Sequence, residues 1–186
     1  MTEKEKCKKG LLYDANFDLE ILKDRMKCQE LCYDYNFTRP SNSVQREKII
    51  KKMQINTGEK FWIEQPFHCD YGYNIEIGEG FYSNYNMIIL DSAKVKFGNN
   101  VFIGPNCAFY TAGHPLDYKI RNKGLEYAKP IEIGNNVWIG GNVVVLPGVK
   151  IGDNSVIGAG SIVSKDIPIN VVAVGNPCKT IKHITE

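Results

Sequence analysis

The sequence predicts a mainly β protein: a parallel β-helix of six-residue repeats, with a short helical N-terminal segment and one extruded loop. Three observations support this fold class. Aliphatic residues recur every six positions from residue 133 onward, apolar residues before about position 60 have helical spacing, and a polar stretch at about 110–130 interrupts the repeat. The length of 186 residues suits one compact domain with a small appendage.

Composition limits the classes of partner. Hydrophobic residues make up 43% and charged residues 24%, as in an ordinary globular protein. The net charge is only +2, which argues against a nucleic-acid partner. No apolar run approaches the roughly 18–20 residues that span a bilayer. The charged first residues do not form a secretory signal, so we expect no membrane partner and a cytoplasmic location with reduced thiols.

The first 60 residues are expected to form the helical N-terminal segment. Cys28, Leu31, Cys32 and Tyr35 recur at helical spacing and form one apolar face. Pro40, followed by a serine at position 41 or 43, marks the start of a second helix. Cys28 and Cys32 therefore share a helix face. The absence of a CxxC pair favours core packing over metal or redox chemistry, and no metal is expected.

The repeat is expected to occupy a domain over residues 61–186, ending in a C-terminal tail. Three short strands with their turns close one coil of about 18 residues, and each aliphatic residue points inward onto the coil below. The phase is uninterrupted at Ile133, Ile139, Val145, Ile151, Ile157, Val163 and Ile169. Earlier positions keep the same spacing at Phe97 and Ile103, and the interval of eight from Ile89 to Phe97 indicates two inserted residues.

One long polar stretch breaks this period. The run YTAGHPLDYKIRNKGLEYAKP, at about residues 110–130, is longer and more charged than any repeat. We expect it to be extruded from one coil. Insertions of this kind usually collect on the functional face of a solenoid, so the stretch predicts a site.

Five motifs in a fixed order resemble those of the maltose and galactoside O-acetyltransferases, a family of hexapeptide-repeat acyltransferases. The resemblance covers nearly the whole chain. It implies a left-handed coil, a homotrimer with active sites between subunits, and acetyl-CoA as the acetyl donor. The expected activity is transfer of acetyl to a hydroxyl of a sugar such as maltose, glucose or a galactoside. The motifs are FHCDYGYNI (67–75), GHPLD (113–117), IGNNVWIGGNVVVLPGV (133–149), GDNSVIGAGSIVSKDIP (152–168) and NPCKTIK (176–182).

The resemblance also assigns an acceptor site. A sugar hydroxyl needs a base to remove its proton, and His114 in the GHPLD motif matches the catalytic base of the family. Asn84 matches the position that holds acceptor and acetyl group near the base. The remaining acceptor contacts are expected from Asp14, Asp70, Tyr82, Ser92 and Glu126. Turn or cap formation is the alternative role for Asn84, Asp14 and Asp70, and coil packing for Tyr82.

Three positions differ from the galactoside enzymes. Asp70 stands where they carry a serine, Ser92 where they carry an aspartate, and Glu126 where they carry a methionine. The loop and the segment around Asp70 look more like the maltose branch, whereas Asp14 suits the galactoside pattern. The identity of the acceptor therefore stays open.

The donor site is expected along the later repeats. The backbone N–H of Gly141 is a candidate donor to the oxyanion, since glycine lets coenzyme A approach the backbone. Two C-terminal lysines are expected to meet the phosphates of the coenzyme; their alternative role is solvated surface. The full set is Trp138, Gly141, Ala159, Ser164, Lys165, Lys179 and Lys182.

Other functions fit parts of this pattern. The same chemistry can act on an antibiotic or other xenobiotic hydroxyl. A serine acetyltransferase is disfavoured because those relatives carry a larger helical N-terminal part. A γ-type carbonic anhydrase needs three zinc-binding histidines, and His68, His114 and His183 lack that spacing. A non-catalytic solenoid scaffold is the alternative of a different class, and it predicts decay of the GHPLD motif.

Overall fold

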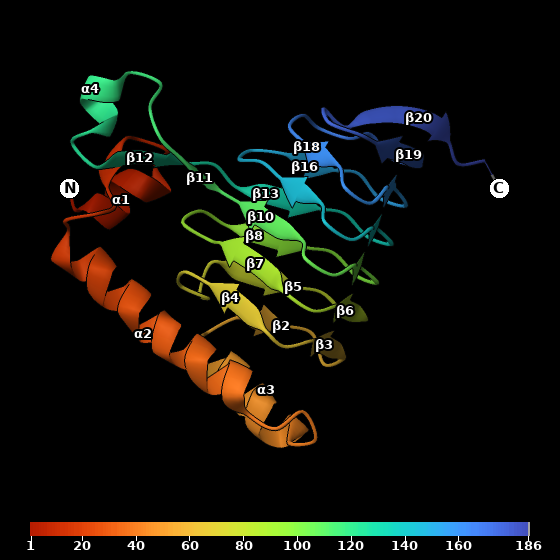
Figure 1. The fold of residues 1–186 in the computed structure, drawn as a ribbon, viewed down its shortest axis with the longest axis horizontal. Coiled ribbons are helices and arrows are strands. Elements are labelled where there is room, and N and C mark those ends of the chain that lie inside the picture. Colours follow the sequence, from red (N-terminus) through yellow and green to blue (C-terminus); the bar gives the residue numbers. More distant parts are fainter. Residues whose placement is uncertain (186) are drawn as a thin grey trace.

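The computed structural model describes residues 1–185, and most of them form a solenoid with parallel sheets on its three sides (Figure 1). We name each side after its first strand. The β2 sheet contains β2 (Asn56–Thr57), β5 (Ile75–Ile77), β8 (Val95–Phe97), β13 (Ile131–Ile133) and β16 (Lys150–Ile151). The β4 sheet contains β4 (Phe67–Cys69), β7 (Met87–Leu90), β10 (Ala108–Tyr110), β15 (Val144–Val145) and β18 (Ile162–Val163).

The β3 sheet is the longest of the three. It contains β3 (Phe61–Ile63), β6 (Phe81–Ser83), β9 (Phe102–Ile103), β14 (Trp138–Ile139), β17 (Val156–Ile157), β19 (Val171–Val174) and β20 (Lys179–His183). All its pairs are parallel except the last, in which β20 turns back antiparallel to β19. The chain visits the β2, β3 and β4 sheets in turn, so each coil has three corners.

The length of a coil is read from the residues that pair between neighbouring coils. Phe67 pairs with Met87, 20 positions on, whereas Ile133 pairs with Ile151, 18 positions on. The two extra residues of the early coils lie between the β4 and β2 sheets, as the interval of eight from Ile89 to Phe97 predicted. This corner is therefore widest beside the long insertion.

The inward side chains confirm the repeat at all but its last position. The phased residues from Ile133 to Val163 are almost completely buried, but Ile169 is 60% exposed. The prediction for Ile169 was wrong because the last coil is two residues shorter. Ile151 bridges Ile167, only 16 positions on, so Ile167 takes the inward place.

The N-terminal segment forms three helices and two short strands. α1 (Glu3–Lys8) leads into β1 (Tyr13–Asp14), and α2 (Leu19–Phe37) and α3 (Ser43–Lys52) follow. α2 crosses the end of the solenoid and packs its buried face, including Cys28, Cys32 and Tyr35, against β4 (Figure 1). Parallel pairing begins at Asn56, where β2 joins β5. Among residues 1–185, no helix is both long and apolar enough to cross a bilayer.

The insertion is an ordered arm between β10 and β13. It holds β11 (Ala112–Gly113), α4 (Tyr118–Arg121) and β12 (Leu125–Ala128). β12 pairs antiparallel with β11 on one side and with β1 on the other. The N-terminal segment therefore contacts the arm through the pairing of β1 with β12. The arm projects from the solenoid beside α1 (Figure 1).

Candidate functional site

The arm and the neighbouring turns gather several of the predicted residues at the corner between the β4 and β2 sheets. His114 follows β11 directly, and its ring is half exposed. Its Nδ1 lies 3.3 Å from the carbonyl oxygen of Leu125. A carbonyl accepts but cannot donate, so this contact places the ring proton on Nδ1. The other nitrogen, Nε2, is left as a proton acceptor.

One carboxylate faces this histidine, and a second lies near the first. The Oε1 atom of Glu126 lies 3.7 Å from Nε2 of His114, and the hydroxyl of Tyr13 donates to Oε2 of Glu126 at 3.3 Å. Burial raises the pKa of Asp70, and the neighbouring Arg25 guanidinium partly opposes this effect. Asp70 and Glu126 are close enough for their charges to interact. The corner therefore places the Glu126 carboxylate beside the free nitrogen of the histidine, with Asp70 near Glu126.

Asp91 holds the turn that carries Asp70. The Asp91 side chain is fully buried, and its Oδ1 accepts from the backbone N–H groups of Asp70 and Tyr71, each at 2.9 Å. Its Oδ2 accepts from the N–H of Gly72 at 2.8 Å. Three backbone donors on one carboxylate leave this turn little freedom, so Asp70 is positioned by the coil above it.

Arg25 is a member of this group that sequence reasoning missed. It comes from the middle of α2 and donates to the Tyr71 hydroxyl at 3.0 Å and to the carbonyl of Ala15 at 3.3 Å. Its Nε is buried and has no hydrogen-bond partner among residues 1–185. No motif surrounds Arg25. Only the docking of α2 against the first coils brings it beside Asp70.

Two other predicted acceptor residues have structural contacts. The Oδ1 atom of Asp14 accepts from the backbone N–H groups of Asn16 and Phe17, which is the turn-forming role named as its alternative. Ser92 lies half-buried beside α1, and its carbonyl accepts from the Cys7 thiol and from Asn74. Both residues belong to the same corner as His114.

A second group lies at the corner between the β3 and β4 sheets. Asn84 follows β6, Gly141 follows β14 and Ala159 follows β17, so the three occupy one column of turns. The Oδ1 atom of Asn84 accepts from the Tyr85 N–H at 2.8 Å, which leaves its amide NH₂ group to donate outward. Among residues 1–185, the backbone N–H of Gly141 has no hydrogen-bond acceptor.

Further donor-site candidates lie in a row on the outer face of the β3 sheet. The strand registers place Tyr82, Trp138 and Lys182 in one row, together with Phe102, Val156 and Val172. Trp138 is 58% exposed. It lies three strands from Lys182, or about 14 Å at the usual strand spacing. Ser164 and Lys165 are also exposed, but they follow β18 at the corner between the β4 and β2 sheets.

The two predicted catalytic residues come from different corners of the coil. His114 belongs to the arm between the β4 and β2 sheets, whereas Asn84 begins the turn between the β3 and β4 sheets. Figure 1 places β6 on the far side of the solenoid from the arm that carries α4. A single chain therefore separates two groups of candidate residues, which we call half-sites: one contains the histidine, and the other contains the asparagine, glycine and tryptophan.

Comparisons with known proteins agree with this architecture. Residues 6–53 match the family model "Maltose acetyltransferase hexapeptide capping motif", and residues 130–165 match the model "Bacterial transferase hexapeptide (six repeats)". The galactoside O-acetyltransferase of Escherichia coli K12 is 51% identical over 87% of this chain and 80% of its own length.

Two solved structures extend the likeness to the whole chain. A maltose O-acetyltransferase from Clostridium difficile 630 is 50% identical, with a TM-score of 0.96 over 100% of this chain and 99% of that one. A hexapeptide-repeat acetyltransferase from Vibrio cholerae O1 biovar eltor, solved with acetyl coenzyme A, is 36% identical. Its TM-score is 0.91, and the likeness covers 100% of both chains.

Proposed function

Since this chain belongs to the maltose and galactoside O-acetyltransferase family, we propose that it moves the acetyl group of acetyl-CoA to a sugar hydroxyl. The observation that carries the proposal is the setting of His114. Its Nδ1 faces the carbonyl of Leu125, and its Nε2 opens toward Glu126 at the corner that also holds Asp70. A ring fixed in this way is suited to accept a proton from a hydroxyl.

The half-sites support an active site shared between two copies in a homotrimer. The histidine corner of one copy would meet the β3 sheet and the Asn84 corner of the next. The exposed row on that sheet, with Trp138 and Phe102 both more than half exposed, offers apolar area for a neighbouring copy and the donor. In a closed ring of identical copies, each copy must present two different surfaces, one to each neighbour. The histidine corner and the asparagine corner of each copy would be these two surfaces.

The reaction then proceeds by direct transfer. Nε2 of His114 takes the proton of the acceptor hydroxyl as its oxygen attacks the thioester carbonyl carbon. The N–H of Gly141 donates to the oxyanion, and the amide of Asn84 holds the acetyl oxygen or the acceptor. The carbon–sulfur bond breaks as the intermediate collapses, and the proton on His114 passes to the departing thiolate. No covalent acyl-enzyme is required.

The part of the site that would bind the sugar is rich in groups that accept hydrogen bonds. Asp70 and Glu126 can each accept from two sugar hydroxyls, which would fix the orientation of a ring against His114. The Arg25 guanidinium beside Asp70 favours the charged form of that carboxylate. This polarity favours an acceptor with several hydroxyl groups, such as a carbohydrate.

A mass-spectrometric acceptor screen tests the proposal. Purified protein and acetyl-CoA are incubated with glucose, maltose, galactosides and hydroxyl-bearing antibiotics, beside the His114→Ala variant. His183→Ala is the control, because His183 is exposed in the last strand. We expect one added acetyl on a sugar, with turnover lowered roughly 10²–10⁴-fold in His114→Ala and unchanged in the control. Acetylation of the antibiotics alone would overturn the sugar assignment, and equal turnover in His114→Ala would overturn the assigned base.

A further inference from the structure

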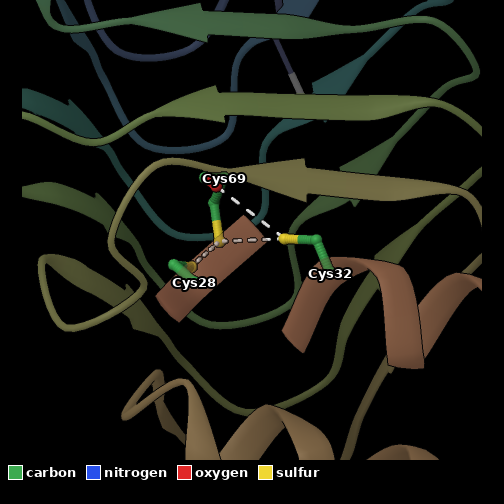
Figure 2. A group of neighbouring side chains, drawn as sticks. All are labelled: Cys28, Cys32 and Cys69. Atoms are coloured by element: carbon green, nitrogen blue, oxygen red, sulfur yellow. Dashed lines mark hydrogen bonds between the residues drawn. The ribbon is translucent and has the colours of Figure 1, made fainter. Parts of the chain in front are cut away.

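Three cysteine thiols converge beneath α2, and one of them, Cys69, directly precedes Asp70 in the chain. Cys28 and Cys32 are one helical turn apart, and Cys69 ends β4, 37 residues beyond Cys32 (Figure 2). The sulfur of Cys69 lies 3.5 Å from that of Cys28 and 4.0 Å from that of Cys32. All three sulfur atoms lie within 4.8 Å of one another. The sequence favoured plain core packing for the helical pair, because nothing in it brings Cys69 to them.

The spacing of the sulfurs fits a single bound ion. Three thiolates about 2.3 Å from a common metal ion lie about 3.8–4.0 Å from one another. The observed separations bracket that range, so an ion requires rotamer adjustments rather than backbone movement. The cluster also draws ligands from two elements, the capping helix and the first coil, so an ion there joins them.

The surroundings of the cluster favour a cation. Each cysteine is at least 95% buried, and the buried Asp91 carboxylate is close enough for its charge to act on Cys28 and Cys69. Asp70 adds a second negative charge near Cys32. A cavity of about 410 Å³ borders Cys32, Cys69 and His68, which gives room for a water ligand beside the cluster.

We propose that Cys28, Cys32 and Cys69 form a three-thiolate site for a thiophilic metal ion, with Zn²⁺ as its occupant. Soft thiolate ligands select such ions, and a zinc ion with three protein ligands keeps a fourth position that the cavity can supply with water. Binding releases the thiol protons and involves no change of oxidation state. The ion fastens α2 to β4 and takes no part in acetyl transfer.

Cadmium binding tests the site, because Cd²⁺ takes the same thiolate ligands and adds a sulfur-to-metal absorption band in the ultraviolet. The measurement uses the Cys7→Ser, Cys107→Ser, Cys178→Ser variant, in which only the three clustered thiols are left. We expect one Cd²⁺ per chain with the charge-transfer band. We also expect Zn²⁺ to raise the unfolding temperature of this variant by several degrees, since it binds only the folded chain.

A matched variant replaces the three clustered cysteines, as Cys28→Ser, Cys32→Ser and Cys69→Ser, and keeps the other three. It should bind no Cd²⁺. If it fails to fold, Cys32→Ser alone replaces it, because Cys32 borders the cavity. Absence of cadmium binding in the variant that keeps the cluster would overturn the proposal. So would binding without the sulfur band, or loss of two free thiols to a disulfide in metal-free protein.

Discussion

Lys179 and Lys182 project from the same face of β20, although they are three residues apart. In a regular strand such residues point to opposite faces. Here the register shifts between Val172 and Ala173, so that Lys182 pairs with Val172 and Lys179 pairs with Val174. The bulge inserts one extra residue into β20 and returns both ammonium groups to the outer side. Lys182 thereby ends the row that contains Trp138, and Lys179 lies beside that row on the same face.

Loss of either lysine should weaken donor binding. Lys179→Ala and Lys182→Ala each remove one cation from the face that we assign to the phosphates of acetyl-CoA. We expect the dissociation constant to rise about 2- to 10-fold, with a smaller effect at high salt because exposed charges are screened. Titration calorimetry at two salt concentrations measures this. Lys51→Ala, on the exposed face of α3, is the control, and an equal effect there would remove the lysines from the donor site.

Mixed oligomers should recover activity that neither parent has. His114→Ala and Asn84→Ala disable different half-sites, so an assembly containing both variants includes junctions with an intact histidine from one copy and an intact asparagine from the next. Every trimer that contains both variants has one intact junction out of three, so the doubly purified fraction should show about one third of the wild-type activity. Co-expression with two affinity tags and assay of the doubly purified fraction measures it. Activity no higher than that of the parents would place both residues in one chain's site.

Asp91→Asn should destabilise the fold. An asparagine presents only one oxygen, so its NH₂ group must face at least one of the three backbone N–H groups that the carboxylate now satisfies. We expect the free energy of unfolding to fall by about 1–3 kcal/mol. Urea denaturation measures the change. Asp166→Asn serves as control, because Asp166 is exposed and its Oδ1 accepts one backbone N–H, that of Lys150.

The same carboxylate predicts a dependence of stability on pH. Burial raises the pKa of Asp91 from 3.8 to about 6, so between these values the folded chain keeps a proton that the unfolded chain has released. The contribution of this group to stability is complete below pH ~4 and is lost as the pH rises through ~6. Unfolding free energies from pH 4 to 7 should show this slope in the wild type and lack it in Asp91→Asn. Parallel curves would contradict the assignment.

Two adjacent glycines should respond differently to the same substitution. A Cβ on Gly140 would lie 2.6 Å from the backbone nitrogen of Ala159 in the next coil. Gly140→Ala should therefore cost about 1–3 kcal/mol of stability. A Cβ on Gly141 would meet Pro105 at 3.2 Å, so Gly141→Ala should fold nearly as well and instead lower turnover by crowding its N–H. Thermal melts and acetyl-transfer rates separate the two, and equal loss of stability would refute the distinction.

Local spacing was enough to predict the coil. The inward residues from Ile133 to Val163 follow from a period of six, because each coil repeats the same strand and turn. The helical face of Cys28 and Cys32 follows from the 3.6-residue period in the same way. The loop around His114 stood out because it breaks the period. These features depend on residues near one another in the chain.

Other features depend on how distant segments pack. Ile169 is exposed and Ile167 points inward, because the last coil is two residues shorter. Only the pairing of Ile151 with Ile167 reveals this difference. Arg25 reaches Asp70, and Cys69 reaches the helical cysteines, because α2 docks across the first coils. The shared face of Lys179 and Lys182 depends on a bulge against β19. Periodicity shows which way a side chain points along its own element, whereas only packing places residues from separate elements beside one another.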